Sequence, residues 1–228
     1  MWVDLFLWLA LAHLLSDFVL QNNKVCRNKT EKKWHSLYQY AHAVIVFSLS
    51  WLASFNLHFW WCALIIGITH LGIDIWKSYR AEKIKWFVID QSLHILVLVG
   101  TSILWCLNNE WSAPYHIKTV YIACAVAALV CWKPANIFIK QMLKHYSVTP
   151  PSTNSGFNAG ALIGTIERWL ILIFVCLQHY EALGLLIAAK SIIRFSEKDT
   201  EKTEYVLAGT LLSIFIAVLA GLMLRYFM

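Results

Sequence analysis

The chain has 228 residues, of which 59% are hydrophobic and 14% are charged. A mean hydropathy of +0.59 excludes an ordinary soluble domain of this length and favours a polytopic membrane protein. The formal net charge of +6 does not indicate nucleic-acid binding, because the basic residues fall in short loops beside apolar segments, where they set topology and meet anionic lipid.

Eight apolar segments follow one another along the chain, each close to the length of a membrane span. The first segment has no basic residue before it and contains polar residues, so we expect a retained span rather than a cleaved signal peptide. The sequence therefore predicts an all-α, polytopic membrane helix bundle with about eight transmembrane helices. We expect these helices near residues 2–21, 37–56, 58–76, 86–107, 117–132, 159–178, 182–195 (the shortest) and 205–226.

The prolines and the polar segments indicate how the spans are grouped. All four prolines fall outside the predicted spans, so we expect continuous helices. A basic amphipathic stretch followed by a Pro/Ser/Asn-rich stretch is typical of an interfacial helix and a cytoplasmic linker. We predict a five-helix bundle over residues 1–132, this connecting segment over 133–158, and a three-helix bundle over 159–228.

Histidine and aspartate recur four residues apart in three of the first four spans. A carboxylate at the centre of a membrane helix costs about 2.5–3.5 kcal/mol, so three of them require a shared reason. Lys/Arg-rich loops after the first, third and fifth spans indicate a cytoplasmic side, which places all three pairs at one depth in the cytoplasmic leaflet. The pairs are His13/Asp17, His70/Asp74 and Asp90/His94, and His42 of the second span lies at the same depth.

A metal site is the favoured interpretation of this convergence. Three carboxylates beside neutral histidines carry a charge of −3, which a low-dielectric site requires cations to balance. Imidazole and carboxylate donors suit zinc, manganese or iron, as one or two divalent ions. For any single pair, the alternative is a buried ion pair or a hydrogen bond between helices. The predicted metal ligands are His13, Asp17, His42, His70, Asp74, Asp90 and His94.

A second group of charged residues interrupts the predicted sixth and seventh spans. Glu167 and Arg168 lie in the sixth span, and Lys190 and Arg194 lie near the inner end of the seventh. In one interpretation, Glu167 pairs with Lys190 or Arg168, and Arg194 extends to the lipid headgroups. In the other, the excess positive charge of this group binds a phosphate headgroup. The candidate catalytic residues are Gln21, Lys77, Glu167, Lys190 and Arg194. Gln21 or one of the aspartates would position water, and Lys77, Lys190 or Arg194 would neutralise the substrate anion.

Several motifs in order resemble a bacterial membrane family known as domain of unknown function 3307. They are AHLLSDFVLQ, THLGIDIWK, DQSLH, GALIGTIERWLIL, AAKSIIRF and EYVLAGTLLS. The resemblance implies a multi-pass protein of the bacterial inner membrane and implies little about activity. More distantly, the H-x-x-x-D pattern is similar to that of predicted membrane-bound metal-dependent hydrolases, a grouping compared with zinc phospholipases of the C type.

The favoured function is a metal-dependent hydrolase that acts from the cytoplasmic side on a phosphoester or another lipid-linked bond. An ion-coupled transporter, a metal carrier or a membrane signalling component could use the same residues, and a purely structural polar core is a third interpretation. The expected partners are membrane lipids, with anionic headgroups among them, and the sequence is compatible with an oligomer.

The charge distribution predicts that both termini lie outside, with residues 22–36, 77–85, 133–158 and 196–203 in the cytoplasm. Single cysteines placed in each of these four segments should therefore react with a membrane-impermeant maleimide only in inverted vesicles. Labelling of the loop after the first span from the periplasmic side would reverse the whole topology.

Overall fold

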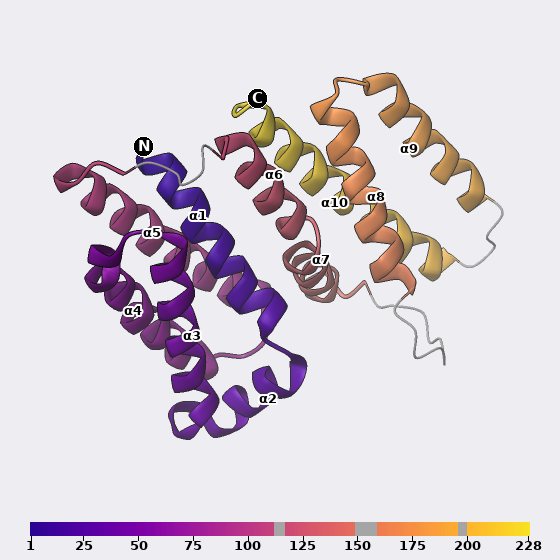
Figure 1. The fold of residues 1–228 in the computed structure, drawn as a ribbon. Coiled ribbons are helices and arrows are strands. Elements are labelled where there is room, and N and C mark those ends of the chain that lie inside the picture. The colour runs from indigo at the N-terminus through magenta and orange to yellow at the C-terminus, as the bar shows by residue number, and fades with distance from the viewer. Residues whose placement is uncertain (112–116, 149–158, 196–199) are drawn as a thin grey trace. The chain divides into compact units, whose positions relative to one another are not determined.

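The computed structural model describes residues 1–111, 117–148, 159–195 and 200–228, and this part of the chain contains helices and no strand (Figure 1). For residues 159, 193–195 and 200–203 only the backbone is described. Most of the predicted cytoplasmic linker, residues 149–158, lies outside the described ranges. The prediction of an all-helical protein is confirmed for the described residues.

Ten α-helices and three shorter helical segments form the described chain. The α-helices are α1 (Trp2–Leu14), α2 (Asn23–Lys32), α3 (Leu37–Ala53), α4 (Trp60–Ser78), α5 (Ile84–Asn108), α6 (Thr119–Val130), α7 (Lys133–His145), α8 (Ala159–Cys176), α9 (Tyr180–Phe195) and α10 (Thr200–Arg225). The shorter segments are a π-helical turn, η1 (Leu15–Leu20), and two 3-10 turns, η2 (Lys33–His35) and η3 (Leu57–Phe59).

Five helical segments in the described residues are long and apolar enough to cross a membrane. They are Trp2–Leu20, Leu57–Ser78, Ile84–Asn108, Thr119–His145 and Glu204–Arg225. Helix α3 is apolar but shorter, at 17 residues. Helices suited to membrane insertion are therefore present, whereas the predicted number of eight spans is not established.

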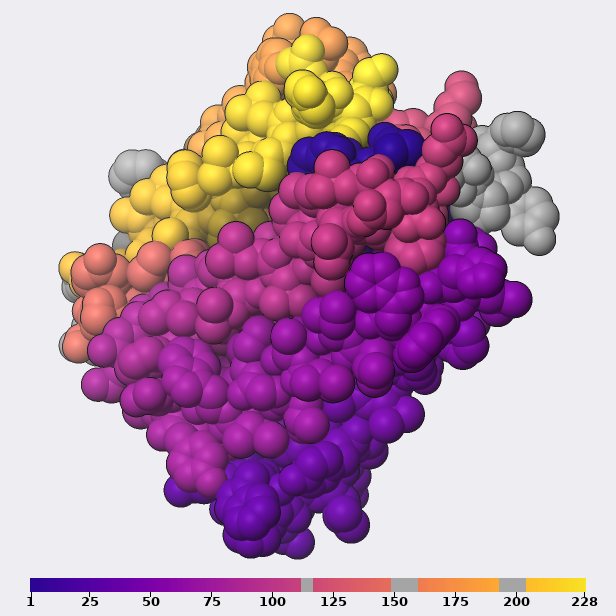
Figure 2. Space-filling model, turned by 90° about the vertical axis from the view of Figure 1, so that its left-hand side faces the viewer, coloured from indigo at the N-terminus to yellow at the C-terminus, as the bar shows by residue number. Residues whose placement is uncertain are grey.

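The outer surfaces of the spanning candidates carry large apolar side chains. On α4 and α5, the exposed residues include Leu64, Ile68, Val88, Leu96 and Leu107. Figure 2 shows the side of the molecule on which these two helices lie, in purple and magenta. Such a surface is unfavourable in water and is suited to contact with lipid.

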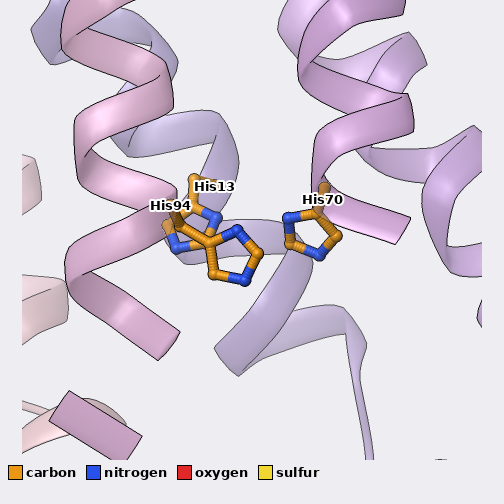
Figure 3. A group of neighbouring side chains, drawn as sticks. All are labelled: His13, His70 and His94. Atoms are coloured by element: carbon orange, nitrogen blue, oxygen red, sulfur yellow. The ribbon is translucent and has the colours of Figure 1, made fainter. Parts of the chain in front are cut away.

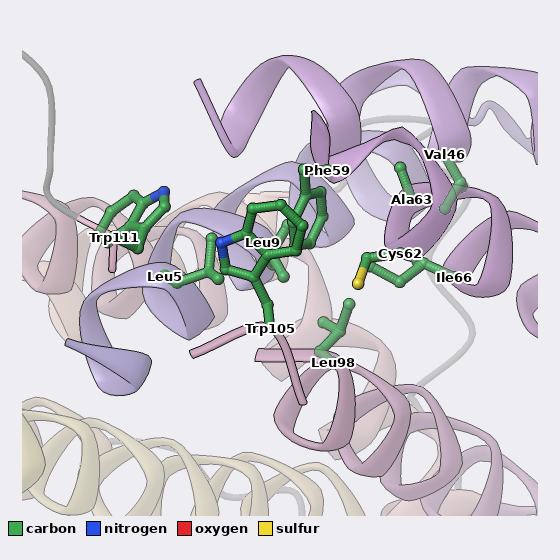
Figure 4. Close-up of a cluster of buried hydrophobic side chains, with 10 residues drawn as sticks. All are labelled: Leu5, Leu9, Val46, Phe59, Cys62, Ala63, Ile66, Leu98, Trp105 and Trp111. Atoms are coloured by element: carbon green, nitrogen blue, oxygen red, sulfur yellow. The ribbon is translucent and has the colours of Figure 1, made fainter. Parts of the chain in front are cut away.

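The described chain divides into two compact units, Met1–Val126 and Ala127–Met228. In the first unit, α1 packs against α3 and α5, and α4 packs against the same two helices. Tryptophan and aliphatic side chains fill one half of this unit, around Trp105, Phe59 and Leu98 (Figure 4). Gly67 allows α4 to approach α3 closely, because a Cβ atom there would lie 3.1 Å from Cβ of Phe47. The other half of the unit holds the polar side chains.

The first span departs from the predicted continuous α-helix near its end. Residues Leu15–Leu20 form a π-helical turn, and the backbone becomes extended at Gln21. The Ser16 hydroxyl donates a hydrogen bond to the carbonyl oxygen of His13, 2.8 Å away. The sequence pattern did not reveal this turn, because hydrophobic periodicity does not separate one widened turn from an α-helix.

The second unit is built around a buried arginine. Arg168 of α8 is 1% exposed, and its guanidinium donates to the carbonyl oxygen of Cys131 and to side chains of Asn136, Thr165 and Ser213. These partners belong to α7, α8, α10 and the turn between α6 and α7, so the guanidinium ties these elements together. Helix α7 is seen end-on in Figure 1 while α8 is seen lengthwise, so the two helices cross.

A Gly221→Ala substitution should destabilise the second unit. The added Cβ would lie 2.7 Å from Cγ1 of Val175, which belongs to the buried core of that unit. Overpacking of this kind costs about 1–3 kcal/mol. The matched control is Gly184→Ala, where no atom lies within 4 Å of the added Cβ. Thermal unfolding in detergent should show a lower melting temperature for the first variant only, and equal melting of both would contradict the close packing.

Candidate metal centre

Four helices bring the predicted ligands to one end of the first unit. His13 and Asp17 lie at the end of the first span, and His70 and Asp74 lie in the last turns of α4. His42 lies in the second turn of α3, and Asp90 and His94 lie in the first turns of α5. The chain direction alternates between successive spans, so two helix ends and two helix beginnings meet at one level. The structure thus brings all seven residues together.

The most compact arrangement joins Asp17, His42 and His70. Oδ1 of Asp17 lies 3.2 Å from Nε2 of His42 and 3.5 Å from Nε2 of His70. The two Nε2 atoms lie 3.0 Å apart. Both histidines are buried and Asp17 is nearly so. Three donor atoms from three helices therefore surround one point.

Asp74 lies beside this group and faces it with one oxygen. Oδ2 of Asp74 is 3.7 Å from Nε2 of His70 and 3.9 Å from Nε2 of His42. The same oxygen accepts a hydrogen bond from the ammonium group of Lys29, 2.7 Å away. Asp74 therefore stands between a lysine and the two histidines.

His13, His70 and His94 form a histidine-rich side of the cluster (Figure 3). The rings of His70 and His94 stack with their centroids 4.1 Å apart, and the ring centroids of His13 and His94 lie 5.0 Å apart. Nε2 of His94 is 3.5 Å from Oδ1 of Asp90. Neither of these two buried atoms has a hydrogen-bond partner among the described residues. They lie in ion-pair contact with each other, and both belong to a group that could hold a metal ion.

Three overlapping groups in the described residues could hold a metal ion. Their donor atoms lie within 4.8 Å of one another in each group, and every predicted ligand belongs to at least one group. The groups are His13/His70/His94, Asp17/His42/His70 and Asp74/Asp90/His94.

Two lysines alter the charge balance expected from the sequence. Lys29 binds Asp74, and Lys77, which the sequence suggested as a partner of a substrate anion, binds Asp90. Three aspartates and two lysines leave a formal charge of −1 with neutral histidines, instead of −3. One divalent ion is therefore enough to reverse the sign of the charge.

Sequence reasoning missed Lys29 and Gln39. Lys29 belongs to a polar stretch whose only evident role was to set topology, and nothing in its spacing relates it to a span. Gln39 is 1% exposed, and neither atom of its amide has a hydrogen-bond partner among the described residues. Its position three residues before His42, on the same helix face, was the available signal.

The other candidate catalytic residues do not join the cluster through the described contacts. Oε1 of Gln21 accepts a hydrogen bond from the Cys26 thiol, 3.2 Å away, and its amide nitrogen is buried without a partner. Glu167 and Lys190 form an ion pair with each other in the second unit. The side chain of Arg194 lies outside the described part of α9.

The family comparison covers the unit that holds this cluster. Residues 5–131 match the family described as Protein of unknown function (DUF3307). The chain belongs to this family. No curated protein and no solved structure matches the chain, and the more distant resemblance to membrane-bound hydrolases has no support from these comparisons. The DUF3307 region contains all seven predicted ligands, whereas Glu167, Lys190 and Arg194 lie beyond it.

Replacing Lys77 with methionine should destabilise the DUF3307 unit, because it leaves the buried Asp90 carboxylate without its cation. Loss of a partner from a buried polar group costs about 1–3 kcal/mol and more for a charge. Lys83→Met, at an exposed position just before α5, is the control. Adding Asp90→Asn to Lys77→Met should recover part of the loss of melting temperature, and no recovery would contradict the ion pair.

Proposed function

We propose that this protein is a metal-dependent hydrolase of the bacterial inner membrane that holds one divalent ion between Asp17, His42 and His70. The observation that carries the proposal is the mutual separation of three donor atoms, which is 3.0–3.5 Å for every pair. In a tetrahedral zinc site with bonds of about 2.0 Å, neighbouring donors lie about 3.3 Å apart. The three side chains thus have the spacing of ligands around one ion.

A purely structural hydrogen bond explains this spacing less well. With one proton, one of the three contacts has no proton of its own. With a proton on each Nε2, Oδ1 of Asp17 can accept both, but the two N–H groups then face each other with their nitrogens 3.0 Å apart. All three residues lie in a low-dielectric interior, where an unsatisfied polar atom is costly. A cation shared by all three satisfies each of them at once.

The charge of the cluster supports one ion rather than two. Asp74 and Asp90 are paired with lysines, so Asp17 is the carboxylate without an ammonium partner among the described residues. One divalent ion changes the formal charge of the cluster from −1 to +1, which suits a hydroxide or an anionic substrate group. Two ions would leave +3 in a buried site.

Two histidines with one carboxylate leave an ion with open coordination positions, as catalytic sites do. Bound there, zinc, manganese or iron would make a water molecule nucleophilic near neutral pH and would polarise a phosphoester. His94 and Asp90, whose Nε2 and Oδ1 atoms lie 3.5 Å apart, would accept and return a proton. The substrate would be a phosphoester or another lipid-linked bond at the cytoplasmic surface, where anionic headgroups gather.

Transport of a cation is the competing function for the same donors. It requires a water path through both halves of the unit, and the half opposite the cluster is filled by a packed core. Leu5, Leu9, Phe59, Cys62 and Ala63 are 0% exposed there. This packing favours an enzyme that is reached from one side.

Elemental analysis of the purified protein should find about one zinc, manganese or iron ion per chain. Asp17→Asn and His42→Gln should lose most of this metal, because each removes one of three ligands. His58→Gln, an exposed histidine elsewhere in the first unit, should retain it. A chelator should lower the melting temperature of the wild type in detergent and leave Asp17→Asn unchanged.

The metal-loaded protein should hydrolyse the chromogenic diester bis-p-nitrophenyl phosphate, and the metal-depleted protein should not. If the purified wild type contains no metal and its melting temperature does not change with a chelator, the cluster serves helix packing and not metal binding. Metal without hydrolysis would favour a carrier.

A further inference from the structure

Helix α2 is attached to the first unit by a charged side chain. It is a polar helix of 10 residues that lies outside the candidate spans and contacts α3 and α4. Lys29 is its one buried residue, with 7% of its surface exposed. Further polar contacts of α2 in the described part of the chain include hydrogen bonds from Ser36 to Asn28 and from Cys26 to Gln21. Docking of α2 thus lacks a buried apolar anchor.

The Lys29 ammonium occupies an oxygen that faces the metal centre. Its Nζ lies 2.7 Å from Oδ2 of Asp74, and this oxygen is 3.7 Å from Nε2 of His70. An ion between Asp17, His42 and His70 would find Oδ2 of Asp74 as the next oxygen. The ion and the ammonium group would then compete for one oxygen and repel each other.

We propose that Asp74 becomes the fourth protein ligand of the ion, with water in a fifth position, and that Lys29 is an exchangeable cation which holds this ligand until metal binds. Metal binding then releases Lys29 and, with it, helix α2. The inference rests on the proposed metal centre and adds its regulation: the site is covered when empty and uncovered when loaded.

Release has a structural consequence because α2 is short. Isolated helices below about 12–15 residues are marginal in water, so an undocked α2 should unfold. Its unfolding would open the end of the unit at which the ligands gather. Its release lowers the formal charge of the loaded cluster from +1 to 0, and it frees the Lys29 ammonium to meet the anionic group of a substrate. By linkage, the factor by which metal binding favours release of α2 equals the factor by which release of α2 raises metal affinity, so a variant in which α2 is already released should bind metal more tightly.

Trypsin cleavage after Arg27 measures this release, because a protease cuts an unfolded segment much faster than a docked helix. In wild-type protein in detergent, saturating zinc or manganese should raise the cleavage rate about tenfold over protein with chelator. Lys29→Gln should be cut rapidly with or without metal. It should also bind metal about tenfold more tightly by titration calorimetry.

The matched control is Lys32→Gln, an exposed lysine on the same helix that also removes one tryptic site. It should behave as the wild type in both measurements. Metal binding to the wild type with an unchanged cleavage rate, and with no gain of affinity in Lys29→Gln, would overturn the exchange and leave the metal centre intact. Absence of metal binding in both proteins would overturn the metal centre as well. The wild-type comparison needs no variant, so misfolding of Lys29→Gln would not prevent the test.

Discussion

Burial of three carboxylates in a unit with an apolar exterior is the constraint on which the first half of this protein depends. Each carboxylate needs a positive partner, because neither lipid nor the packed core can solvate it. Asp74 and Asp90 find lysines, and Asp17 finds only imidazole groups and a serine hydroxyl among the described residues. The arrangement of the spans meets this need, since each of the four contributes a histidine at the same level and three also contribute an aspartate.

The spans of the first unit are apolar at one end and polar at the other. At one end, aromatic and aliphatic side chains around Trp105 fix the packing of the spans. At the other end, polar side chains meet where apolar packing no longer holds the helices together. A rigid apolar half and an electrostatically adjustable half within the same helices would allow ligands to move without loss of the fold.

Much of the cluster could be predicted from the sequence because it depends on two regular quantities. The i, i+4 spacing places His70 and Asp74 on one face, and alternation of chain direction sets the level of each pair. Lys29 could not be predicted in this way, since it reaches the site from a polar helix with no hydrophobic periodicity. The partner of Lys77 was equally hidden, because a long flexible side chain can reach several carboxylates. For Glu167, the sequence allowed either an internal pair or an anion site, and the structure shows the pair with Lys190.

The π-helical turn at Leu15–Leu20 has a consequence for how this protein can change over evolutionary time. A π turn contains one residue more than the α-helical turn it replaces, and it is less stable. Deletion of Leu15 or Ser16 would yield a more regular helix, yet it would move Asp17 to another position around the helix relative to His13 and so away from His42. Local stability and the geometry of the donor atoms thus favour different chain lengths at this point. The first span is therefore a place where insertions and deletions should be rejected even though most apolar substitutions are accepted.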